Sequence, residues 1–371
     1  MLTISHPYIP GKLELEKEEI VAIVGKNGSG KTTLINSILC EMKNEINVDG
    51  KDFCNERRYD ELSAVFQDPS SQILAETLND ELRIISLYHQ VNFELARILM
   101  GDFLFQNFFT LSDGYKKRFV ISSILSSQPK YVLLDEPLSN LDRNGSKLVL
   151  EILPKGSLIA EHRTREISGL VDRVYLLKET GMREIEKEKL KDEEFLRKNG
   201  LRGFTLDNVD NGLLGEKILD FDYKDLRIEV RESEIVCLLG PNGSGKTTLL
   251  KKLSKKIYSV FQNPDLQFFQ ESVEKEVGNT EALRLFGLWD IRDKSPFVLS
   301  TGQKMRTLIA AAYASGSKVI GLDEPTVAMD GDGLIAFRKM LKLLKEEGRG
   351  VIIATHDEDI VNLCDTKIRL G

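Results

Sequence analysis

The sequence predicts an α/β protein with two tandem domains, each a mostly parallel sheet core with a helical subdomain. Three observations support this prediction. The pattern Gly-x-x-x-x-Gly-Lys-Thr occurs twice, over residues 25–32 and 240–247. A short apolar run typical of a buried strand precedes each copy (20–24 and 235–239), and helix-compatible residues follow it. The other motifs of the first half recur in the second half in the same order, which indicates an internal repeat.

The two glycine-rich loops are predicted to bind phosphate groups. Glycines let backbone N–H groups close around a phosphate, and the N-terminus of the following helix adds its positive end. The loop lysines would reach the outer phosphates, and Thr32 and Thr247 would ligate Mg²⁺. The residues assigned to this role are Gly25, Lys26, Asn27, Gly28, Ser29, Gly30, Lys31, Thr32 and Thr33 in the first loop, and Gly240, Pro241, Asn242, Gly243, Ser244, Gly245, Lys246, Thr247 and Thr248 in the second.

The composition is that of a soluble globular protein of 371 residues, with 41% hydrophobic and 29% charged residues. The net charge of −7 disfavours a general nucleic-acid-binding surface. No apolar run approaches the roughly 18 residues needed to span a bilayer, and residues 1–10 lack a signal-peptide pattern. The four cysteines show no C-x-x-C spacing. We therefore expect reduced cysteines in a cytoplasmic protein, with neither a zinc site nor a disulfide framework.

The predicted boundaries are a first domain over 1–177, a charged linker over 178–203 and a shortened second domain over 204–371. The linker is rich in charged, helix-forming residues. It could be a docking segment, but a solvated helical linker is favoured.

The second domain is shorter mainly between its phosphate loop and a later glutamine. That gap is 36 residues from Lys31 to Gln67 but only 16 residues from Lys246 to Gln262. The shorter gap holds one helix and one short strand. The longer one has room for an added hairpin at about 45–53, with Asp-Gly as its turn.

Each half also contains an apolar strand that ends in Asp-Glu-Pro. An acid at the carboxyl end of a buried parallel strand lies where such sheets bind ligands. Asp135 and Asp323 would hold Mg²⁺ through its water shell, and Glu136 and Glu324 would orient or deprotonate an attacking water.

About twenty residues before each acid pair comes a Leu-Ser-x-Gly sequence. A serine hydroxyl, flexible backbone N–H groups and a helix dipole together form another phosphate-binding terminus. The residues assigned to it are Ser112 and Gly114 in the first half and Ser300 and Gly302 in the second.

With these motifs the chain resembles the ATP-binding cassette ATPases, whose signature is close to Leu-Ser-Gly-Gly-Gln. The resemblance covers nearly the whole chain, twice. It extends to a glutamine loop (Gln67 and Gln262) and to a switch histidine at a strand end (His162 and His356). It implies hydrolysis of ATP with Mg²⁺, with the glutamines as further Mg²⁺ ligands and the histidines as catalytic residues beside the glutamates.

The resemblance further implies two composite sites. Each ATP would lie between the phosphate loop of one cassette and the signature of the other. Ser300 and Gly302 would complete the first loop's site, and Ser112 and Gly114 the second's. Binding of two ATP molecules would close the pair, and hydrolysis would reopen it.

The sequence departs from the family pattern at several positions. Asp113 replaces a signature glycine and would bring negative charge near a γ-phosphate, whereas Thr301 is a milder change. Tyr115 replaces the signature glutamine, and Val327 replaces a usual small polar residue. The second loop's site borrows the signature with Asp113, so we expect it to hydrolyse ATP more slowly. Both halves keep the glutamate and the histidine, so neither site is expected to be inactive.

Tyr8 and Tyr223 both lie 17 residues before the first glycine of their loop. They could stack on adenine, although tyrosine in an N-terminal strand is often core. Adenine stacking is slightly favoured.

The residues after each glutamine narrow the subfamily. Phe-Gln-Asp/Asn-Pro-x-x-Gln occurs over 66–72 and 261–267 and is followed by matching segments at 77–81 and 272–276. This pattern looks like the ATPase subunits of energy-coupling factor importers for vitamins or transition-metal ions. In that group this segment lies beside the groove that receives the transmembrane partner. The resemblance implies a peripheral protein on the cytoplasmic face of the membrane. Its partners would be an energy-coupling transmembrane protein and a substrate-binding membrane protein, with no nucleic acid.

Other interpretations remain open. Aromatic residues near these segments could line the partner groove, but core packing is favoured for them: Phe103, Phe105, Phe108, Phe109, Phe268 and Phe269. The alternative function is a soluble tandem cassette ATPase that acts on ribosomes or nucleic acid. The short linker, the unclustered cysteines and the lack of room for a coiled coil disfavour it. The glutamates in both halves disfavour a regulator that binds ATP without hydrolysis.

Overall fold

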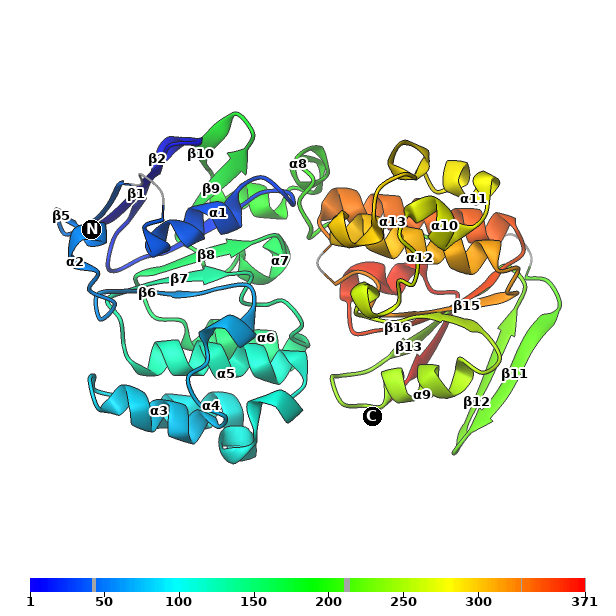
Figure 1. Cartoon of the computed structure of the whole chain (residues 1–371), viewed down its shortest axis with the longest axis horizontal. Coiled ribbons are helices and arrows are strands. Elements are labelled where there is room, and N and C mark those ends of the chain that lie inside the picture. The colour runs from blue at the N-terminus through cyan, green and yellow to red at the C-terminus, as the bar shows by residue number, and fades with distance from the viewer. Residues whose placement is uncertain (42–44, 210–213, 328, 371) are drawn as a thin grey trace. The chain divides into compact units, whose positions relative to one another are not determined.

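The computed structural model of the chain describes residues 1–41, 45–209, 214–327 and 329–370. The chain divides into two compact units, Met1–Phe204 and Thr205–Gly371. Each unit has its own central sheet (Figure 1). Among the described residues, no helix combines the length and the apolar character needed to cross a membrane.

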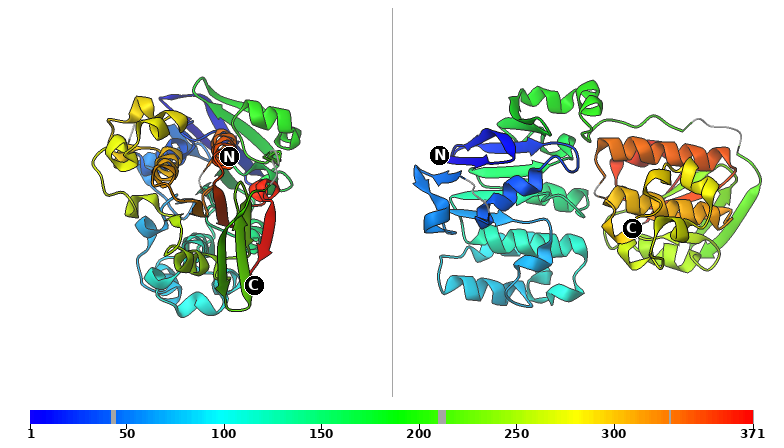
Figure 2. Two further views of the ribbon diagram at one scale, coloured as in Figure 1. Left: turned by 90° about the vertical axis from the view of Figure 1, so that its right-hand side faces the viewer. Right: turned by 45° about the horizontal axis from the view of Figure 1, so that its top comes forward.

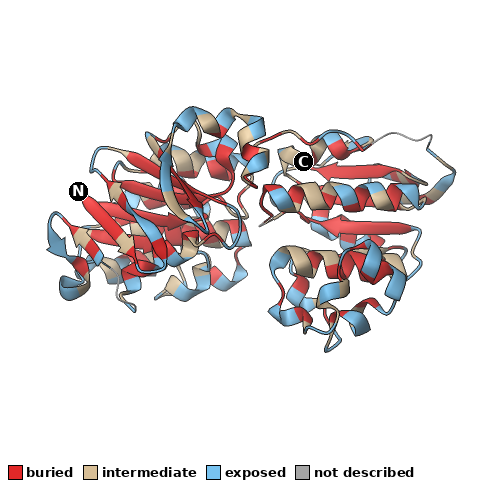
Figure 3. Cartoon of the chain, turned by 90° about the horizontal axis from the view of Figure 1, so that it is seen from above, coloured by how far each residue is buried: buried red, intermediate tan, exposed pale blue. Residues whose placement is uncertain are grey.

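The first unit is built on a six-stranded sheet in the order β10-β9-β3-β8-β7-β6. All neighbours pair in parallel except β9 and β10, which form an antiparallel hairpin at one edge. The strands are β3 (Ile20–Val24), β6 (Leu62–Val65), β7 (Tyr131–Asp135), β8 (Ser157–Glu161), β9 (Arg173–Lys178) and β10 (Gly181–Ile185). The strands β3, β6, β7 and β8 are buried along their whole length, as expected for a parallel sheet covered on both faces (Figure 3).

The helices of the first unit cover both faces of this sheet (Figures 1 and 2). The α-helices are α1 (Lys31–Asn36), α2 (Phe53–Glu56), α3 (Leu78–Ser86), α4 (Phe93–Met100), α5 (Asp113–Ser126), α6 (Arg143–Ile152), α7 (Thr164–Ile167) and α8 (Glu193–Lys198). The short 3-10 helices are η1 (Ser37–Leu39), η2 (Pro69–Gln72), η3 (Gly101–Phe105), η4 (Phe108–Thr110) and η5 (Lys187–Lys191). In particular, α3, α4 and α5 pack together as the predicted helical subdomain.

A second, antiparallel sheet in the first unit has the order β2-β1-β4-β5. Its strands are β1 (Leu2–His6), β2 (Ile9–Leu15), β4 (Glu45–Val48) and β5 (Lys51–Asp52). The hairpin expected at about 45–53 is confirmed as β4 and β5. Its turn residues Asp49 and Gly50 have φ values of 51° and 83°, as a two-residue hairpin turn requires.

The second unit repeats the core of the first. Its five parallel strands have the order β14-β15-β16-β13-β17, which matches β6-β7-β8-β3-β9 strand for strand. The parallel strands are β13 (Ile235–Leu239), β14 (Tyr258–Val260), β15 (Val319–Asp323), β16 (Gly350–Thr355) and β17 (Thr366–Arg369), and β11 (Lys217–Tyr223) and β12 (Leu226–Arg231) form a separate antiparallel pair. This agreement confirms the α/β fold with two tandem cassette domains.

The helices of the second unit also lie on both faces of its sheet (Figure 1). They are α9 (Lys246–Leu253), α10 (Val273–Val277), α11 (Thr280–Leu285), α12 (Thr301–Ala314) and α13 (Gly331–Glu346), with short 3-10 helices η6 (Pro264–Leu266), η7 (Trp289–Ile291), η8 (Pro296–Val298) and η9 (Glu358–Leu363). The residues between α9 and β14 are all described and form no strand. One helix and one short strand therefore fill the shorter gap, as expected.

The charged segment 178–203 differs from the expected solvated helical linker. Its first part forms β10, which pairs with β9, and Arg173 makes an ion pair across this hairpin with Glu184 at 2.7 Å. Farther on, Leu190 and Leu196 are buried. The segment belongs to the first unit because these two leucines pack inward while the surrounding charges stay at the surface.

The expectation of reduced cysteines is wrong. The structure pairs Cys40 with Cys54 and Cys237 with Cys364, with Cα separations of 5.6 and 5.7 Å. All four cysteines of the sequence are therefore paired. Local spacing could not reveal the second bridge, because its cysteines lie 127 residues apart and meet only when β17 pairs with β13.

Candidate functional site

The two phosphate loops have the same local structure, each between a central strand and the helix that follows. Gly30 and Gly245 directly precede α1 and α9 and have φ values of 103° and 94°, where any other residue would be strained. At Gly25, an added Cβ would lie 2.5 Å from Ser29 Oγ and 2.6 Å from the carbonyl oxygen of Leu177. The glycines of the motif are therefore required by the path of the backbone.

The loop lysines are buried and make matching hydrogen bonds. Lys31 Nζ donates to the carbonyl oxygens of Gly25 at 2.7 Å and Lys26 at 3.1 Å. Lys246 makes the same two bonds, at 2.7 and 3.0 Å, with the residues that open the second loop. Both ammonium groups are thus held inside their loops, where a phosphate would be bound.

Asp135 and Asp323 end the strands β7 and β15 and are buried. Burial raises the pKa of each carboxyl group to about 6. A side-chain hydrogen bond from Thr32 works against this rise at Asp135, and Thr247 Oγ1 donates to Asp323 Oδ1 at 3.1 Å. Each unit thus brings its predicted threonine and aspartate ligands together.

This donor set fits Mg²⁺. The ion usually binds one or two carboxylates together with substrate phosphates and water. Across the described ranges, no three His, Cys, Asp or Glu side chains form a cluster that could hold a metal on its own. A buried aspartate beside a phosphate loop therefore fits a magnesium ion that binds together with a nucleotide.

The glutamates that follow these aspartates share an unusual backbone conformation. Glu136 and Glu324 have φ values of 45° and 46°, in the left-handed region that is rare for residues other than glycine. Their backbone N–H groups continue the sheet hydrogen bonding. Glu136 donates to the carbonyl oxygen of Ala160 in β8 at 2.9 Å, and Glu324 donates to that of Ala354 in β16 at 2.8 Å. The same strain at the same motif position in both units is typical of a functional site.

Each glutamate lies against the predicted histidine. In the first unit, His162 Nδ1 is 3.4 Å from Glu136 Oε1, and Gln67 Nε2 donates to Glu136 Oε2 at 3.3 Å. Burial would raise the pKa of Glu136, but His162 and Lys31 outweigh it and lower this pKa to about 2. Glu136 is therefore ionised at neutral pH and can orient a water molecule.

The second unit has the same pair with a different neighbour. His356 Nδ1 lies 2.8 Å from Glu324 Oε1, and Thr355 Oγ1 donates to Glu324 Oε2 at 2.9 Å. Lys246 Nζ is 3.6 Å from the same carboxylate. Each unit therefore brings its predicted lysine, aspartate, glutamate and histidine to one end of its parallel sheet.

The signature serines are placed at the N-termini of long helices. Ser112 caps α5 and Ser300 caps α12, where each hydroxyl accepts a hydrogen bond from a backbone N–H in the first turn. In α12, Gln303 also accepts from the backbone N–H of Ser300 at 3.1 Å, which completes a capping box. In α5, the residue at this position is Tyr115, whose ring packs against Phe103 with centroids 4.0 Å apart.

The two predicted adenine-stacking residues have different environments. Tyr8 lies in the turn between β1 and β2 and is 75% exposed. Tyr223 ends β11 and packs, half-buried, against the core of the second unit. A stacking role for either residue stays a prediction.

In each unit, two side chains at equivalent positions hold the segment that follows the loop glutamine (Gln67 or Gln262). The second glutamine of the motif, Gln72 or Gln267, accepts a hydrogen bond from the backbone N–H of Phe66 or Phe261, at 2.7 and 2.8 Å. Farther on, Glu81 Oε2 accepts from the backbone N–H groups of the two residues at 74 and 75 (2.8 and 2.7 Å), and Glu276 Oε2 accepts from those at 269 and 270 (both 2.9 Å). These contacts give the repeated sequence pattern a structural role.

The aromatic residues near this segment have mixed environments. Phe108 and Phe268 are buried, as core packing requires. Three others are strongly exposed, at 68% for Phe105, 67% for Phe109 and 84% for Phe269. The preference for core packing is therefore wrong for these three.

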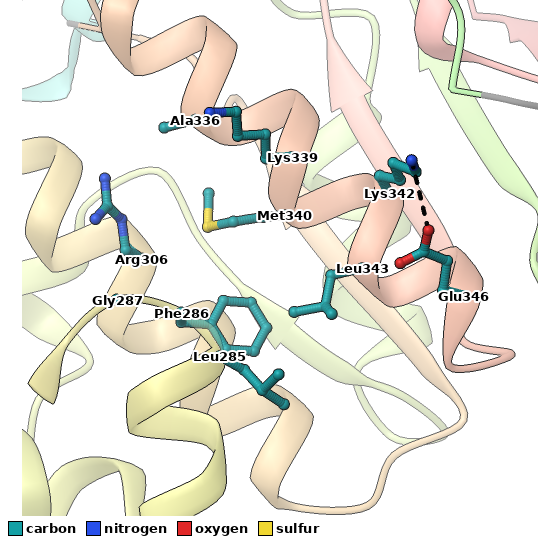
Figure 4. Close-up of a pocket in the computed structure, with 10 residues that line it drawn as sticks. All are labelled: Leu285, Phe286, Gly287, Arg306, Ala336, Lys339, Met340, Lys342, Leu343 and Glu346. Atoms are coloured by element: carbon teal, nitrogen blue, oxygen red, sulfur yellow. Dashed lines mark ion pairs between the residues drawn. The ribbon is translucent and has the colours of Figure 1, made fainter.

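A cavity of about 470 Å³ lies in the second unit (Figure 4). The end of α11, one side of α12 and the second half of α13 line it. Its rim carries Arg306, Lys339 and Lys342, and Lys342 pairs with Glu346 at 3.6 Å. The predicted nucleotide ligands contribute no lining residue to it.

Two buried charged residues near the first site were not predicted. Lys117, on α5, is 1% exposed, and Glu161, the last residue of β8, is fully buried. A comparison of the two halves could have revealed them, because each is a charged residue at a position where the second half has a neutral one. Lys117 aligns with Met305 and Glu161 with Thr355.

Comparisons with known proteins agree with this geometry. The family model described as ABC transporter matches residues 10–139, 223–259 and 251–327. A protein of Sulfurisphaera tokodaii, provisionally described as an ABC transporter ATP-binding protein, is 31% identical over 93% of this chain and 88% of its own length. A Bacillus subtilis protein, provisionally described as an HMP/thiamine import ATP-binding protein, is 27% identical over 94% of this chain and 84% of its own length.

Among solved structures, the chain resembles an archaeal ribosome recycling factor, aABCE1, crystallised with a ribosomal stalk protein. The TM-score is 0.68, with 20% identity over 96% of this chain and 84% of that one. ABCE1 in a ribosome-bound complex with Pelota gives a TM-score of 0.70, with 21% identity over 95% of this chain and 72% of that one. At such identities the likeness shows the fold alone.

Proposed function

The chain belongs to the ABC transporter family, and we propose that it is the ATP-hydrolysing motor subunit of a membrane importer. The importer would be of the energy-coupling factor type, for a vitamin or a transition-metal ion. The partners would be an energy-coupling transmembrane protein and a substrate-binding membrane protein. This chain would then work at the cytoplasmic face of the membrane.

The observation that carries the proposal is a matched pair of exposed apolar side chains in each unit. Leu74 and Phe269 both lie seven residues after their loop glutamine and are 69% and 84% exposed. Phe109 and Phe297 both lie three residues before their signature serine and are 67% and 54% exposed. Large apolar side chains exposed at equivalent places indicate a surface that a partner covers.

The shared hydrogen bonds around this surface support the same conclusion. Glu81 binds the backbone N–H group of Leu74 itself, and Glu276 binds that of Phe269. Each unit thus fixes an exposed apolar side chain beside the loop that carries Gln67 or Gln262. A partner that pushes on this side chain would move a residue of the ATP site.

We propose the following roles at each ATP site. Backbone N–H groups of the phosphate loop and its lysine bind the phosphates, while the loop threonine, the aspartate and the glutamine hold Mg²⁺, which neutralises phosphate charge when bound. The glutamate orients the attacking water, and the histidine holds the glutamate carboxylate. By the family resemblance, the signature of the other unit completes each site, so two ATP molecules would close the pair and hydrolysis would release it.

The alternative is a soluble ATPase that acts on ribosomes, in line with the shared fold of ABCE1. To distinguish the two functions, the tagged chain is purified from detergent-solubilised membranes and, separately, from the ribosome fraction of the same cells. We expect integral membrane proteins to co-purify with the chain. Recovery with ribosomes and with no integral membrane protein would overturn the importer.

The surface itself is tested with the double variant Leu74→Asp/Phe269→Asp. It should lose the membrane partners and keep the ATPase activity of the isolated chain, because both side chains are mostly exposed and neither residue is a predicted ATP ligand. Leu214→Asp is the matched control, since Leu214 is also exposed (41%) but lies outside both loop segments. Equal loss of partners in the control would count against this surface.

A further inference from the structure

A single buried ammonium group joins three parts of the first unit. Lys117 projects from α5, the helix that the signature serine caps. Its Nζ donates to the carbonyl oxygens of Phe66 (3.1 Å), Gln67 (3.3 Å) and Asp135 (3.1 Å). Phe66 and Gln67 directly follow β6, and Asp135 ends β7. The lysine therefore fixes the backbone of the glutamine loop and of the metal-binding strand to the signature helix.

These contacts satisfy the lysine completely. An ammonium group has three N–H donors, and a buried one is costly unless each finds an acceptor. Here three backbone carbonyls accept, and the carboxylates of Asp135, Glu136 and Glu161 supply compensating charge. Lys117 is thus held at one place, without freedom to adopt other partners.

Glu161 is the buried acid that accompanies this lysine. Its Oε1 accepts from the backbone N–H groups of His162 (2.8 Å) and Arg163 (3.1 Å) and lies 3.4 Å from His162 Nδ1. It therefore fixes the strand end that carries the catalytic histidine.

The second unit replaces both charges by neutral residues. Met305 is buried at the position of Lys117. Thr355 stands at the position of Glu161 and hydrogen-bonds the catalytic Glu324 directly. The second glutamine loop is instead attached to α12 by an ion pair between Lys304 and Asp265 (2.7 Å), in which Asp265 is half-exposed. Such a pair is weaker and more easily broken than a buried contact to backbone.

We propose that Lys117 is a positioning residue that locks the first glutamine loop to its signature helix, with Glu161 as one of the buried carboxylates around it. The second unit instead holds its glutamine loop to α12 through the half-exposed Lys304–Asp265 ion pair, which water disrupts more easily than a buried contact. The two ATP sites are thereby mechanically unequal. The inference rests on the proposed ATPase function of both sites but not on transport.

The test uses Lys117→Met, which gives the first unit the residue of the second. The background is Glu324→Gln, so that ATP turnover reports the first site. Amide hydrogen exchange at residues 66–72 should become faster, while exchange at 261–267 stays unchanged. The kcat for ATP should fall by roughly tenfold, as is typical when a residue that orients a ligand is lost, with little change in KM.

Two further variants separate positioning from folding. Lys117→Met/Glu161→Thr reproduces the second unit's pair and should restore thermal stability, because it removes the uncompensated buried carboxylate. Fast exchange at 66–72 should persist in it. Lys116→Met, on the same helix, should change neither the hydrogen exchange at 66–72 nor the thermal stability.

The proposal is overturned if Lys117→Met leaves exchange at 66–72 unchanged, or if the double variant restores slow exchange without the lysine. Hydrogen exchange needs neither a membrane partner nor substrate import. Unchanged exchange in Lys117→Met together with co-purified membrane proteins would overturn this inference and leave the importer function standing. Faster exchange without any membrane partner would do the opposite.

Discussion

At the scale of single residues, Glu81 shows how a buried acid can serve a surface feature. Its side chain is 2% exposed, and its carboxylate accepts two backbone N–H groups from the segment that presents Leu74. Burial raises the pKa of Glu81 above its ordinary value, against the lowering effect of these hydrogen bonds. Holding this segment through a buried carboxylate therefore costs stability when the group is charged.

This balance predicts a pH dependence. A carboxyl group whose pKa is raised by folding binds its proton more tightly in the native state, so it adds stability as the pH falls through that pKa. Glu81→Gln removes this titration but keeps an oxygen that can accept both N–H groups. Calorimetry from pH 8 to pH 5 should show the wild type gaining stability relative to the variant as the pH falls.

The matched control is Glu276→Gln, where the same contacts are made by a half-buried side chain. Comparing the two variants separates the effect of losing the buried Glu81 carboxylate from the effect of changing the same backbone contacts in the second unit. A constant difference between wild type and Glu81→Gln over this range would show that Glu81 does not titrate there.

At the scale of secondary structure, the sequence predicted the strands that lead to the phosphate loops and to the acid pairs. The apolar runs before the phosphate loops and before each Asp-Glu-Pro are strands, and Asp49-Gly50 forms the expected turn. Local patterns sufficed here, because each element's signal lies within about ten residues. The charged segment 178–203 gave a misleading signal, because a few buried leucines outweigh its many surface charges.

Contacts between distant elements could not be predicted in this way. The bridge between Cys237 and Cys364 depends on the pairing of β13 with β17, and Lys117 depends on three segments that meet only in the folded unit. The strain at Glu136 and Glu324 likewise has no local sequence signal. These features arise from packing between distant segments. The sequence could have indicated them only through a comparison of equivalent positions in the two halves of the chain.

The Cys237–Cys364 bridge leads to a prediction at this scale. It closes a separation of 127 residues, against 14 for Cys40–Cys54. By loop entropy the longer bridge stabilises its unit by about 5 kcal/mol and the shorter by about 3 kcal/mol. Cys364→Ala should therefore lower the urea midpoint of the second unit strongly, as followed by fluorescence of Trp289.

Trp289 is the only tryptophan of the chain and lies in the second unit. Cys54→Ala, which opens the bridge of the first unit, should leave the Trp289 transition nearly unchanged. An identical transition of the wild-type chain with and without a reducing agent would mean that the Cys237–Cys364 bridge is not formed in solution.

At the scale of the whole molecule, two similar units carry sites with different surroundings. The first unit has the buried charges Lys117 and Glu161 near its proposed catalytic residues, whereas the second has Met305 and Thr355. The signatures differ as well, since Asp113 replaces glycine in the first one. Asp113 is exposed and lies 3.7 Å from Lys116, so its charge is only partly compensated. The two units thus share one fold, but the residues around their proposed ATP sites differ in charge.

The last prediction concerns this inequality. In the proposed composite arrangement, Asp113 faces the γ-phosphate held by the second loop and slows hydrolysis there by charge repulsion. Glu136→Gln should then remove most of the steady-state ATPase activity, because loss of such a glutamate costs about 10²–10⁴-fold at its own site. Glu324→Gln should leave most of the activity, because the site it disables is already slow.

Asp113→Asn supplies the decisive comparison, since it removes the charge and keeps the shape of the side chain. Combined with Glu136→Gln, it should raise the residual activity, because the remaining turnover comes from the second loop's site. Combined with Glu324→Gln, it should change little. Equal losses in the two glutamate variants, together with no effect of Asp113→Asn, would mean that the charge at the signature does not govern hydrolysis.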